Sequence, residues 1–188
     1  MAHPDAAPTV RTERLVLRPF VAADVDLLYG FMAEPDVLRY FPDPRPPSRE
    51  QVLRSVERQQ KHWRERRCGW WAVELAATGQ FAGWCGLQYL PETDETEVAY
   101  LLGHLYWGRG FATEGARAAV RFGFENLDVS SIVGIVHPQN AASRHVLEKC
   151  GLSLTEEKMY FGMHCCRYVI WRGTAASNMA QRIGGSWI

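Results

Sequence analysis

Apolar residues recur along this chain with two different periods, and each period predicts a different element. Short alternating or apolar runs between turn residues indicate strands, whereas apolar residues three and four apart indicate helices. Helices are expected over residues 22–33, 48–65, 110–127 and from about 140 to 150. Strands are expected over residues 14–20, 70–75, 81–89, 96–102, 132–136, 154–161 and 167–171.

Capping and turn residues support several of these limits. Ser48 and Gln51, three residues apart, are typical of a capping box that opens a helix. Asn140 suits the N-cap of the short helix, and Gly151 suits the left-handed position just beyond its end. Gly162 lies where the last two strands would turn into a hairpin.

The order of these elements predicts the fold class. A meander of antiparallel strands comes first, and the strand–helix–strand unit that follows should be parallel and right-handed. We therefore expect an α/β fold with a mixed, mostly antiparallel central sheet of about seven strands and four helices. A single domain over residues 12–172 fits a chain of 188 residues, with loose termini at 1–11 and 173–188.

Composition narrows the class of protein. Hydrophobic residues make up 47% of the chain, enough for a buried core, and 21 basic residues balance 21 acidic ones, which argues against a nucleic-acid partner. No apolar run approaches the ~20 residues of a membrane span, and no secretory leader is visible. Five cysteines without a CxxC pair and six scattered histidines argue against a disulfide framework and a metal site, so we expect a cytoplasmic protein.

The stretch YWGRGFATEG, residues 106–115, places Gly108 and Gly110 around Arg109 directly before a helix. Glycine permits a tight turn and a close approach of the backbone to a ligand, and the N–H groups of a helix N-terminus bind anions. A plain turn would need the same glycines, so this loop alone leaves both interpretations open.

The helix that follows has two distinct faces. Its small face would let it lie close to the sheet, while the charged face is expected to be solvated. The small residues are Ala112, Ala116, Ala119 and Gly123, and the charged ones are Glu114, Arg117, Arg121 and Glu125.

Two common anion sites do not fit this loop. No Lys–Ser/Thr follows the second glycine, as a P-loop requires, and the third glycine of a dinucleotide fingerprint is misplaced at Gly115. What remains is a pyrophosphate carrier held by the backbone N–H groups from Gly108 to Thr113, with charge from Arg109 and the helix dipole.

Together with TEVAYLL before it and HPQNAASRHVLEKCGL after it, this stretch resembles the GNAT superfamily of acyl-CoA-dependent N-acetyltransferases. The likeness covers roughly residues 12–172 and is greatest to the Rim-type branch, which includes acetyltransferases of ribosomal-protein N-termini. It implies that strands 96–102 and 132–136 splay apart around the pantetheine arm of acetyl-CoA. The implied contacts are the backbone of Leu101 and Leu102 for pantetheine, and Gly108, Arg109, Gly110, Ala112 and Thr113 for the pyrophosphate.

Two positions depart from the superfamily pattern. Trp107 replaces the usual Gln or Arg at the start of the loop, as is common in the Rim-type branch. Leu147 stands where many members place a tyrosine as general acid, so the proton donor must lie elsewhere. The resemblance puts Asn140 and Ser143 near the thioester and makes Ser143 the candidate donor, although the sequence alone would also explain them as a helix cap and a small capping hydroxyl.

Glu97 is the candidate general base, acting directly or through water. It shares a strand face with Ala99 and Leu101, and partial burial would raise its pKa into a useful range. The sequence is equally consistent with two other roles. Glu97 could be an ordinary exposed carboxylate beside Asp94 and Glu95, or it could only attract a cationic acceptor.

We expect the acetyl group of acetyl-CoA to pass to a primary amine by direct attack in a ternary complex, without an acyl-enzyme. Residues 35–47 would form the acceptor wall, and the acceptor is a protein N-terminal amine, a small-molecule amine or an amino-sugar. A non-catalytic acyl-CoA sensor is the alternative from another class, and the chain is expected to be a monomer or a homodimer. The aromatic residues that would line the wall, or belong to the core, are Tyr40, Phe41, Trp70 and Trp84.

Overall fold

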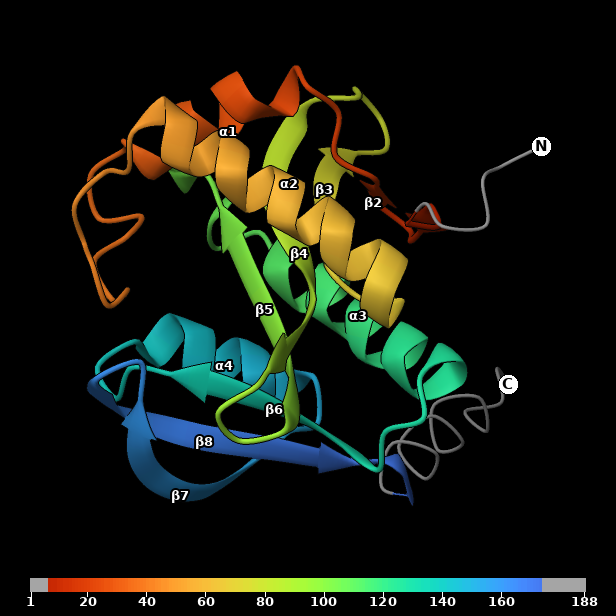
Figure 1. The fold of residues 1–188 in the computed structure, drawn as a ribbon, viewed down its shortest axis with the longest axis vertical. Helices are drawn as coiled ribbons and strands as arrows, with labels where there is room; N and C mark the ends of the chain where they lie inside the picture. The colour runs from red at the N-terminus through yellow and green to blue at the C-terminus, as the bar shows by residue number, and fades with distance from the viewer. Residues whose placement is uncertain (1–6, 174–188) are drawn as a thin grey trace, which may run out of the picture.

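One mixed sheet runs through the part of the chain that the computed structural model describes, residues 7–173 (Figure 1). Its order is β1-β2-β3-β4-β5-β6-β8-β7, and neighbouring strands are antiparallel except for the parallel pair β5–β6. The eight strands are β1 (Val10–Arg11), β2 (Leu15–Arg18), β3 (Trp70–Leu75), β4 (Phe81–Leu90), β5 (Glu95–Leu102), β6 (Ser131–Val136), β7 (Ser153–Tyr160) and β8 (Met163–Trp171).

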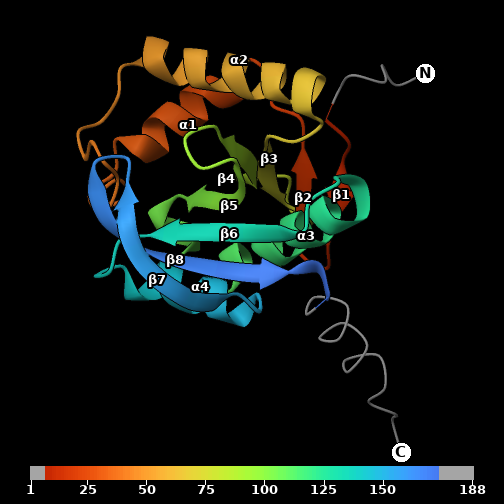
Figure 2. The same ribbon diagram turned by 60° about the horizontal axis from the view of Figure 1, so that its bottom comes forward.

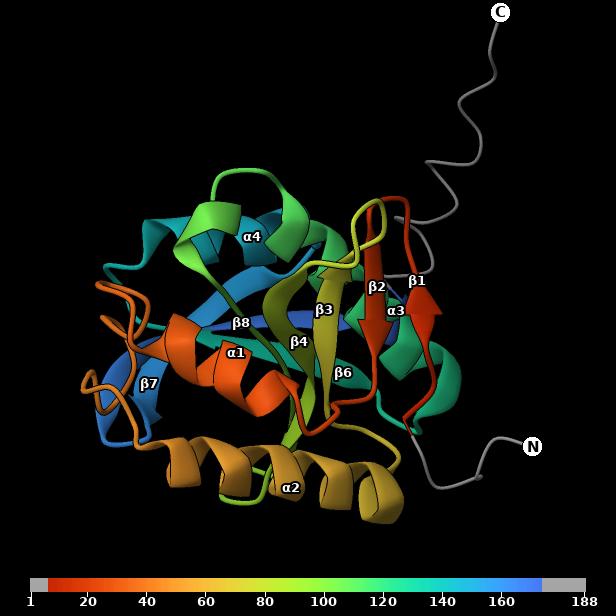
Figure 3. The same ribbon diagram turned by 90° about the horizontal axis from the view of Figure 1, so that it is seen from above.

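Helices cover both faces of this sheet. Figure 3 shows α1 and α2 on one face and α3 and α4 on the other. Within residues 7–173 the four α-helices are α1 (Asp24–Met32), α2 (Arg49–Arg66), α3 (Phe111–Asn126) and α4 (Ala141–Lys149), and a 3-10 turn, η1 (His104–Tyr106), precedes α3. The expected α/β fold and its helices are therefore confirmed.

The sheet starts earlier than the sequence predicts. Val10 and Arg11 pair with β2, so the described sheet has eight strands rather than about seven. The indole N–H of Trp71 donates to the carbonyl of Pro8 over 2.7 Å, which anchors this strand. Two residues are too few to show the alternation of polar and apolar positions that identifies a strand. The position of this strand is set by tertiary contacts instead. The termini at residues 1–6 and 174–188, including Trp187 and Ile188, lie outside the described residues.

The capping box of α2 is present as predicted, with the Ser48 side chain accepting from the backbone of Gln51. The small face of α3 also lies against the sheet, with Ala116 and Ala119 fully buried. A Cβ added at Gly123 would come within 2.7 Å of Leu87 in β4. This close packing fixes the N-terminus of α3 relative to β4 and β5.

Two residues of the charged face of α3 also make contacts: Glu114, which is only partly exposed, and Arg117, which is exposed as expected. Glu114 accepts hydrogen bonds from Thr12 and from the backbone and side chain of Arg14. Arg117 donates to the carbonyl of Lys149 at the end of α4. These residues therefore tie α3 to the start of β2 and to α4.

The parallel pair β5–β6 is short. Glu97 opposite Val133 is the one pair of Cα partners along it within the described chain, although both strands continue beyond this point (Figure 2). On its far side, β6 pairs along its whole length with β8, and Phe161 and Gly162 form the turn that leads from β7 into β8. The central sheet therefore has an opening between two of its middle strands.

Two global features complete the fold. All five cysteines are free thiols. No helix among the described residues is long and apolar enough to cross a membrane.

Candidate functional site

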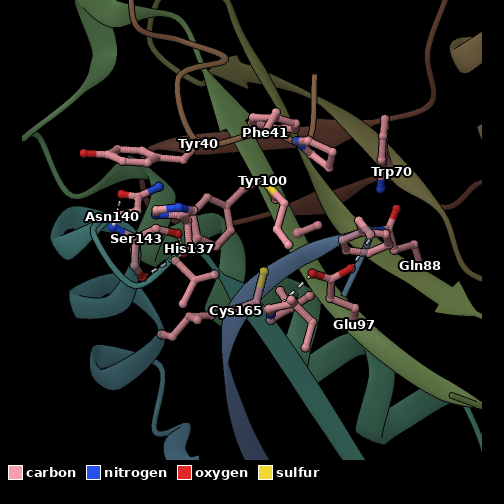
Figure 4. Close-up of a pocket in the computed structure, with 18 of the residues that line it drawn as sticks. Tyr40, Phe41, Trp70, Gln88, Glu97, Tyr100, His137, Asn140, Ser143 and Cys165 are labelled. Carbon is pink, nitrogen blue, oxygen red and sulfur yellow. Dashed lines mark hydrogen bonds between the residues drawn. The ribbon is translucent and has the colours of Figure 1, made fainter. Parts of the chain in front are cut away.

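A half-open cavity of about 300 Å³ occupies the opening between β5 and β6 (Figure 4). Residues from β4, β5 and β6 form its floor, α4 closes one end, and the segment between α1 and α2 lies over it. The cavity brings together three of the residues expected at the site: Glu97, Asn140 and Ser143.

Glu97 is a buried carboxyl group at the point where β5 and β6 part. Only 4% of the residue is exposed. Gln88, directly opposite in β4, donates to one carboxylate oxygen over 2.6 Å, and the backbone N–H of Ile135 donates to the other over 3.3 Å. Burial raises the pKa of Glu97 to about 7, although both hydrogen bonds oppose the shift. Glu97 is therefore not an ordinary exposed carboxylate.

Ser143 lies in the first turn of α4 and is held by two neighbours. Asn140 caps the helix, because its side-chain oxygen accepts from the Ser143 N–H over 3.1 Å. The hydroxyl of Tyr100, from β5, lies 2.8 Å from the Ser143 hydroxyl and also donates to the Ser143 carbonyl over 3.1 Å. Figure 4 shows Tyr100 and Ser143 side by side at the end of the cavity opposite Glu97.

Tyr100 is a site residue that the sequence analysis missed. Its hydroxyl reaches Ser143 from the opposite side of the opening, so a phenol is present in the site although position 147 carries leucine. Burial strongly raises the pKa of Tyr100, which keeps the hydroxyl protonated. No local signal could have identified it, since the contact joins β5 to α4 across 43 positions of sequence.

Leu147 has a packing role. It is 2% exposed, and its methyl groups lie over Gly134 of β6, where an added Cβ would come within 2.5 Å of them. The glycine lets α4 approach β6 closely, and this approach brings the first turn of α4 to the cavity.

The glycine loop has the conformation expected of an anion site. Gly108 and Gly110 both adopt left-handed backbone angles, with φ of 70° and 80°. Gly110 is the N-cap of α3, no side chain caps the helix, and the first backbone bond of the helix runs from the Glu114 N–H to Gly110. The N–H groups of residues 111–113 are therefore left for a ligand.

Two further residues hold this loop in place, and sequence reasoning did not identify either role. The Arg14 guanidinium donates to the Arg109 carbonyl over 3.0 Å and pairs with Glu114. The indole N–H of Trp107 donates to the Leu102 carbonyl over 2.7 Å, which fixes the loop to the end of β5. Trp107 thus has a structural use at the position where the superfamily pattern has Gln or Arg.

The predicted residues fall into three groups in space. Glu97, Asn140 and Ser143 line the cavity, whereas Leu101 and Leu102, both buried, lie further along β5. The five loop residues, Gly108, Arg109, Gly110, Ala112 and Thr113, lie beyond η1 where α3 begins. The three groups are arranged in the order in which a long ligand would meet them along the opening.

All four aromatic residues expected at the acceptor wall line the cavity. Trp70 and Trp84 stack with ring centroids 3.7 Å apart, and Tyr40 stacks on His137 at 5.3 Å. Trp84 also belongs to the hydrophobic core cluster under α1 and α2. This residue therefore lines the cavity and packs in the core at the same time.

Comparison with known proteins gives the family. The model of the acetyltransferase (GNAT) domain matches residues 14–153. The FsC-acetyl coenzyme A-N(2)-transacetylase of Aspergillus fumigatus is 31% identical over 166 residues, which cover 80% of this chain and 67% of that protein.

Solved structures agree with this match. An acetyltransferase from Agrobacterium tumefaciens superposes with a TM-score of 0.77 at 31% identity, covering 87% of this chain and 94% of the other. The ribosomal-protein-S5-alanine acetyltransferase from Vibrio fischeri gives 0.72 at 14% identity, covering 88% and 97%, so the Rim-type likeness extends to the fold. The chain therefore belongs to the GNAT acetyltransferase family, as an acyl-CoA-dependent N-acetyltransferase with acetyl-CoA as its acyl donor.

Proposed function

We propose that this enzyme transfers the acetyl group of acetyl-CoA directly to a primary amine, with Glu97 as general base. The observation that carries the proposal is a buried carboxyl group with a pKa of about 7 in the same cavity as Ser143. A base is most effective when its pKa lies near the working pH, because it is then both ionised and able to take a proton.

Acetyl-CoA would supply a thioester carbonyl that is open to attack by an amine. The residues of the structure suit the two ends of this molecule. The N–H groups of Gly108, Arg109, Gly110, Ala112 and Thr113 would hold the pyrophosphate, with help from the dipole of α3. The backbone of Leu101 and Leu102 would hold the pantetheine, and Asn140 and Ser143, which line the cavity, would lie near the reacting end.

Glu97 would take the proton that the acceptor amine must lose before or during attack. Its two hydrogen-bond donors, Gln88 and the backbone of Ile135, fix the carboxylate without supplying a full positive charge. The pKa therefore stays near 7 and is not lowered by an ion pair. The group can act directly or through one water molecule.

Ser143 would stabilise the charge that develops on sulfur as the thiol leaves. The single proton of the Tyr100 hydroxyl can be donated to the Ser143 carbonyl or to the Ser143 hydroxyl, but not to both. When it is donated to the hydroxyl oxygen, the serine proton is free to point into the cavity. Tyr100 then acts as a positioning residue, because its raised pKa keeps it protonated throughout.

The thiols of the protein are poorly suited to carry an acyl group. Burial raises the pKa of Cys150 to about 12 and also raises the pKa values of Cys85 and Cys165. Since the thiolate is the nucleophile, these groups are unreactive at neutral pH. This supports direct transfer without an acyl-enzyme.

The acceptor is proposed to be a protein N-terminal amine or a small-molecule amine. The Vibrio fischeri neighbour is a ribosomal-protein-S5-alanine acetyltransferase, and another neighbour is a spermidine N-acetyltransferase from Vibrio cholerae, so the fold includes both kinds of acceptor. A non-catalytic acyl-CoA sensor is disfavoured, because it would not need Glu97 and Ser143 in one cavity.

The test is consumption of acetyl-CoA across a panel of peptide N-termini, small amines and amino-sugars, at one pH above 7. The wild-type protein, Glu97→Gln and Ser143→Ala are compared, together with their calorimetric affinities for CoA. We expect both variants to bind CoA within about threefold of wild type and to lose at least about tenfold in turnover. Tight binding of CoA without transfer to any amine would support the sensor and overturn the proposal.

A further inference from the structure

The mouth of the cavity has two exposed aromatic side chains from two different segments of the chain. Phe41, from the segment between α1 and α2, is 36% exposed, and Phe161, from the turn between β7 and β8, is 50% exposed. Exposed phenylalanines at the rim of a functional cavity are typical of contacts with an apolar ligand. The remaining aromatic lining is Tyr40, Trp70, Trp84, Tyr100 and His137.

Phe161 occupies a backbone conformation that is unfavourable for phenylalanine. Tyr160 and Met163 are paired, so Phe161 and Gly162 form a two-residue hairpin turn in which both residues have positive φ, 53° and 78°. Asn, Asp and Gly are the residues that favour such turns, and a bulky side chain at positive φ is an outlier. The turn keeps a phenylalanine despite this cost, and the side chain lines the cavity.

Trp70 and Trp84 make the inner wall of the cavity apolar. The two rings are stacked, and both indole nitrogens are buried without a hydrogen-bond partner among the described residues. Because these nitrogens are covered, the two residues offer the cavity ring surface rather than N–H donors. An apolar body is the kind of ligand that such a wall favours.

The charged residues around the cavity favour an acceptor with a single amino group. Glu97 is the one carboxylate among the described residues that line it, and the proposed reaction uses that group at the reacting amine. Arg58, an exposed residue of the lining, forms no ion pair within residues 7–173. A second ammonium group on the acceptor would have no carboxylate partner here and would be repelled by Arg58.

We propose that the acceptor is a monoamine with an apolar body, which lies between Phe41 and Phe161 while its amino group points toward Glu97. This inference rests on the proposed function and specifies its substrate. Both a small arylalkylamine and a peptide with an apolar first residue have this chemistry. Polyamines do not.

The substrate test compares matched acceptors by kcat/KM. We expect 2-phenylethylamine to exceed both propylamine and spermidine by at least about tenfold, since loss of even one methylene contact costs that much in an apolar pocket. A short peptide beginning with Phe, measured against one beginning with Ser, shows whether the enzyme also accepts the same body on a peptide. Spermidine equal to or better than 2-phenylethylamine would overturn the inference.

The decisive variant is Phe161→Asn, because it separates binding from folding. Asparagine tolerates positive φ, so the Tm should stay the same or rise by about 2 °C, and CoA affinity should not change. The preference for 2-phenylethylamine over propylamine should fall by about tenfold. Met159→Thr is the matched control: it removes an exposed apolar side chain from the same hairpin, outside the cavity lining, and should keep the preference.

Two further measurements complete the test. Arg58→Glu should bring the kcat/KM for spermidine at least about threefold closer to that for 2-phenylethylamine, and an unchanged ratio contradicts the charge argument. Calorimetric binding of 2-phenylethylamine to the CoA complex separates the two proposals. Binding that depends on Phe161, without turnover, would overturn the proposed function and leave only the site for an apolar amine. A preference unaffected by Phe161→Asn would refute the inference alone.

Discussion

Replacing Glu97 by glutamine should make the protein more resistant to alkaline destabilisation while it impairs catalysis. The carboxyl group is 4% exposed, and burial raises its pKa from the ordinary 4.5 to about 7. Glutamine has nearly the same shape and stays neutral at every pH. It can also still accept from the Ile135 N–H and pair with the amide of Gln88.

The sign and the size of the effect follow from the two pKa values. Below pH 4.5 the group is protonated in both the folded and the unfolded chain and contributes no pH dependence. Between pH 4.5 and 7 the unfolded chain releases the proton and the folded chain keeps it, so the free energy of unfolding falls as the pH rises. The pKa values differ by about 2.5, and each unit corresponds to about 1.36 kcal/mol, which gives a total loss of about 3 kcal/mol.

The assay is urea unfolding of wild type and Glu97→Gln at pH 5 and pH 8. Relative to the variant, the wild type should lose about 2.5 kcal/mol of unfolding free energy between these two pH values. Glu125→Gln, which removes an exposed carboxylate from α3, is the control and should follow the wild type. A difference between wild type and Glu97→Gln that does not change with pH would refute the raised pKa and, with it, the suitability of Glu97 as a base.

Three other perturbations test the loop and the Tyr100–Ser143 pair. Gly110→Val should weaken CoA binding at least about tenfold while the circular dichroism spectrum stays native. Valine is strained at a φ of 80° and covers the backbone that the pyrophosphate must approach. Unchanged affinity would show that the loop is not part of the binding site. Arg14→Ala should weaken CoA binding, measured by calorimetry, about two- to tenfold, because the hydrogen bond to the Arg109 carbonyl is lost. An equal loss of turnover at saturating acetyl-CoA would contradict a role limited to cofactor binding. Tyr100→Phe should lower kcat about tenfold and leave CoA affinity within about twofold, whereas a fall in affinity alone would make Tyr100 a binding residue.

The local signals in the sequence predict most of the fold. The capping box at Ser48, the N-cap at Asn140 and the hairpin turn at Gly162 all depend on neighbours within a few residues, and the structure contains each of them. The small residues of α3 likewise predict a close contact with the sheet, because their spacing follows directly from the helix period.

The parts that sequence reasoning missed depend on contacts between distant segments. Gln88 meets Glu97 only because of the register between β4 and β5, and one shifted position would turn its side chain to the other face. Tyr100 meets Ser143 because α4 packs closely on β6. The burial that gives Glu97 its raised pKa arises in the same way, so sequence alone left its environment open between buried and exposed.

The pH dependence of kcat/KM for a single acceptor amine tests the role of Glu97 most directly. Wild type should show an inflexion near pH 7, where Glu97 becomes ionised and able to take a proton. Glu97→Gln should lack this inflexion and be at least about tenfold slower at pH 8. The same inflexion at an undiminished rate in Glu97→Gln would show that another group is the base.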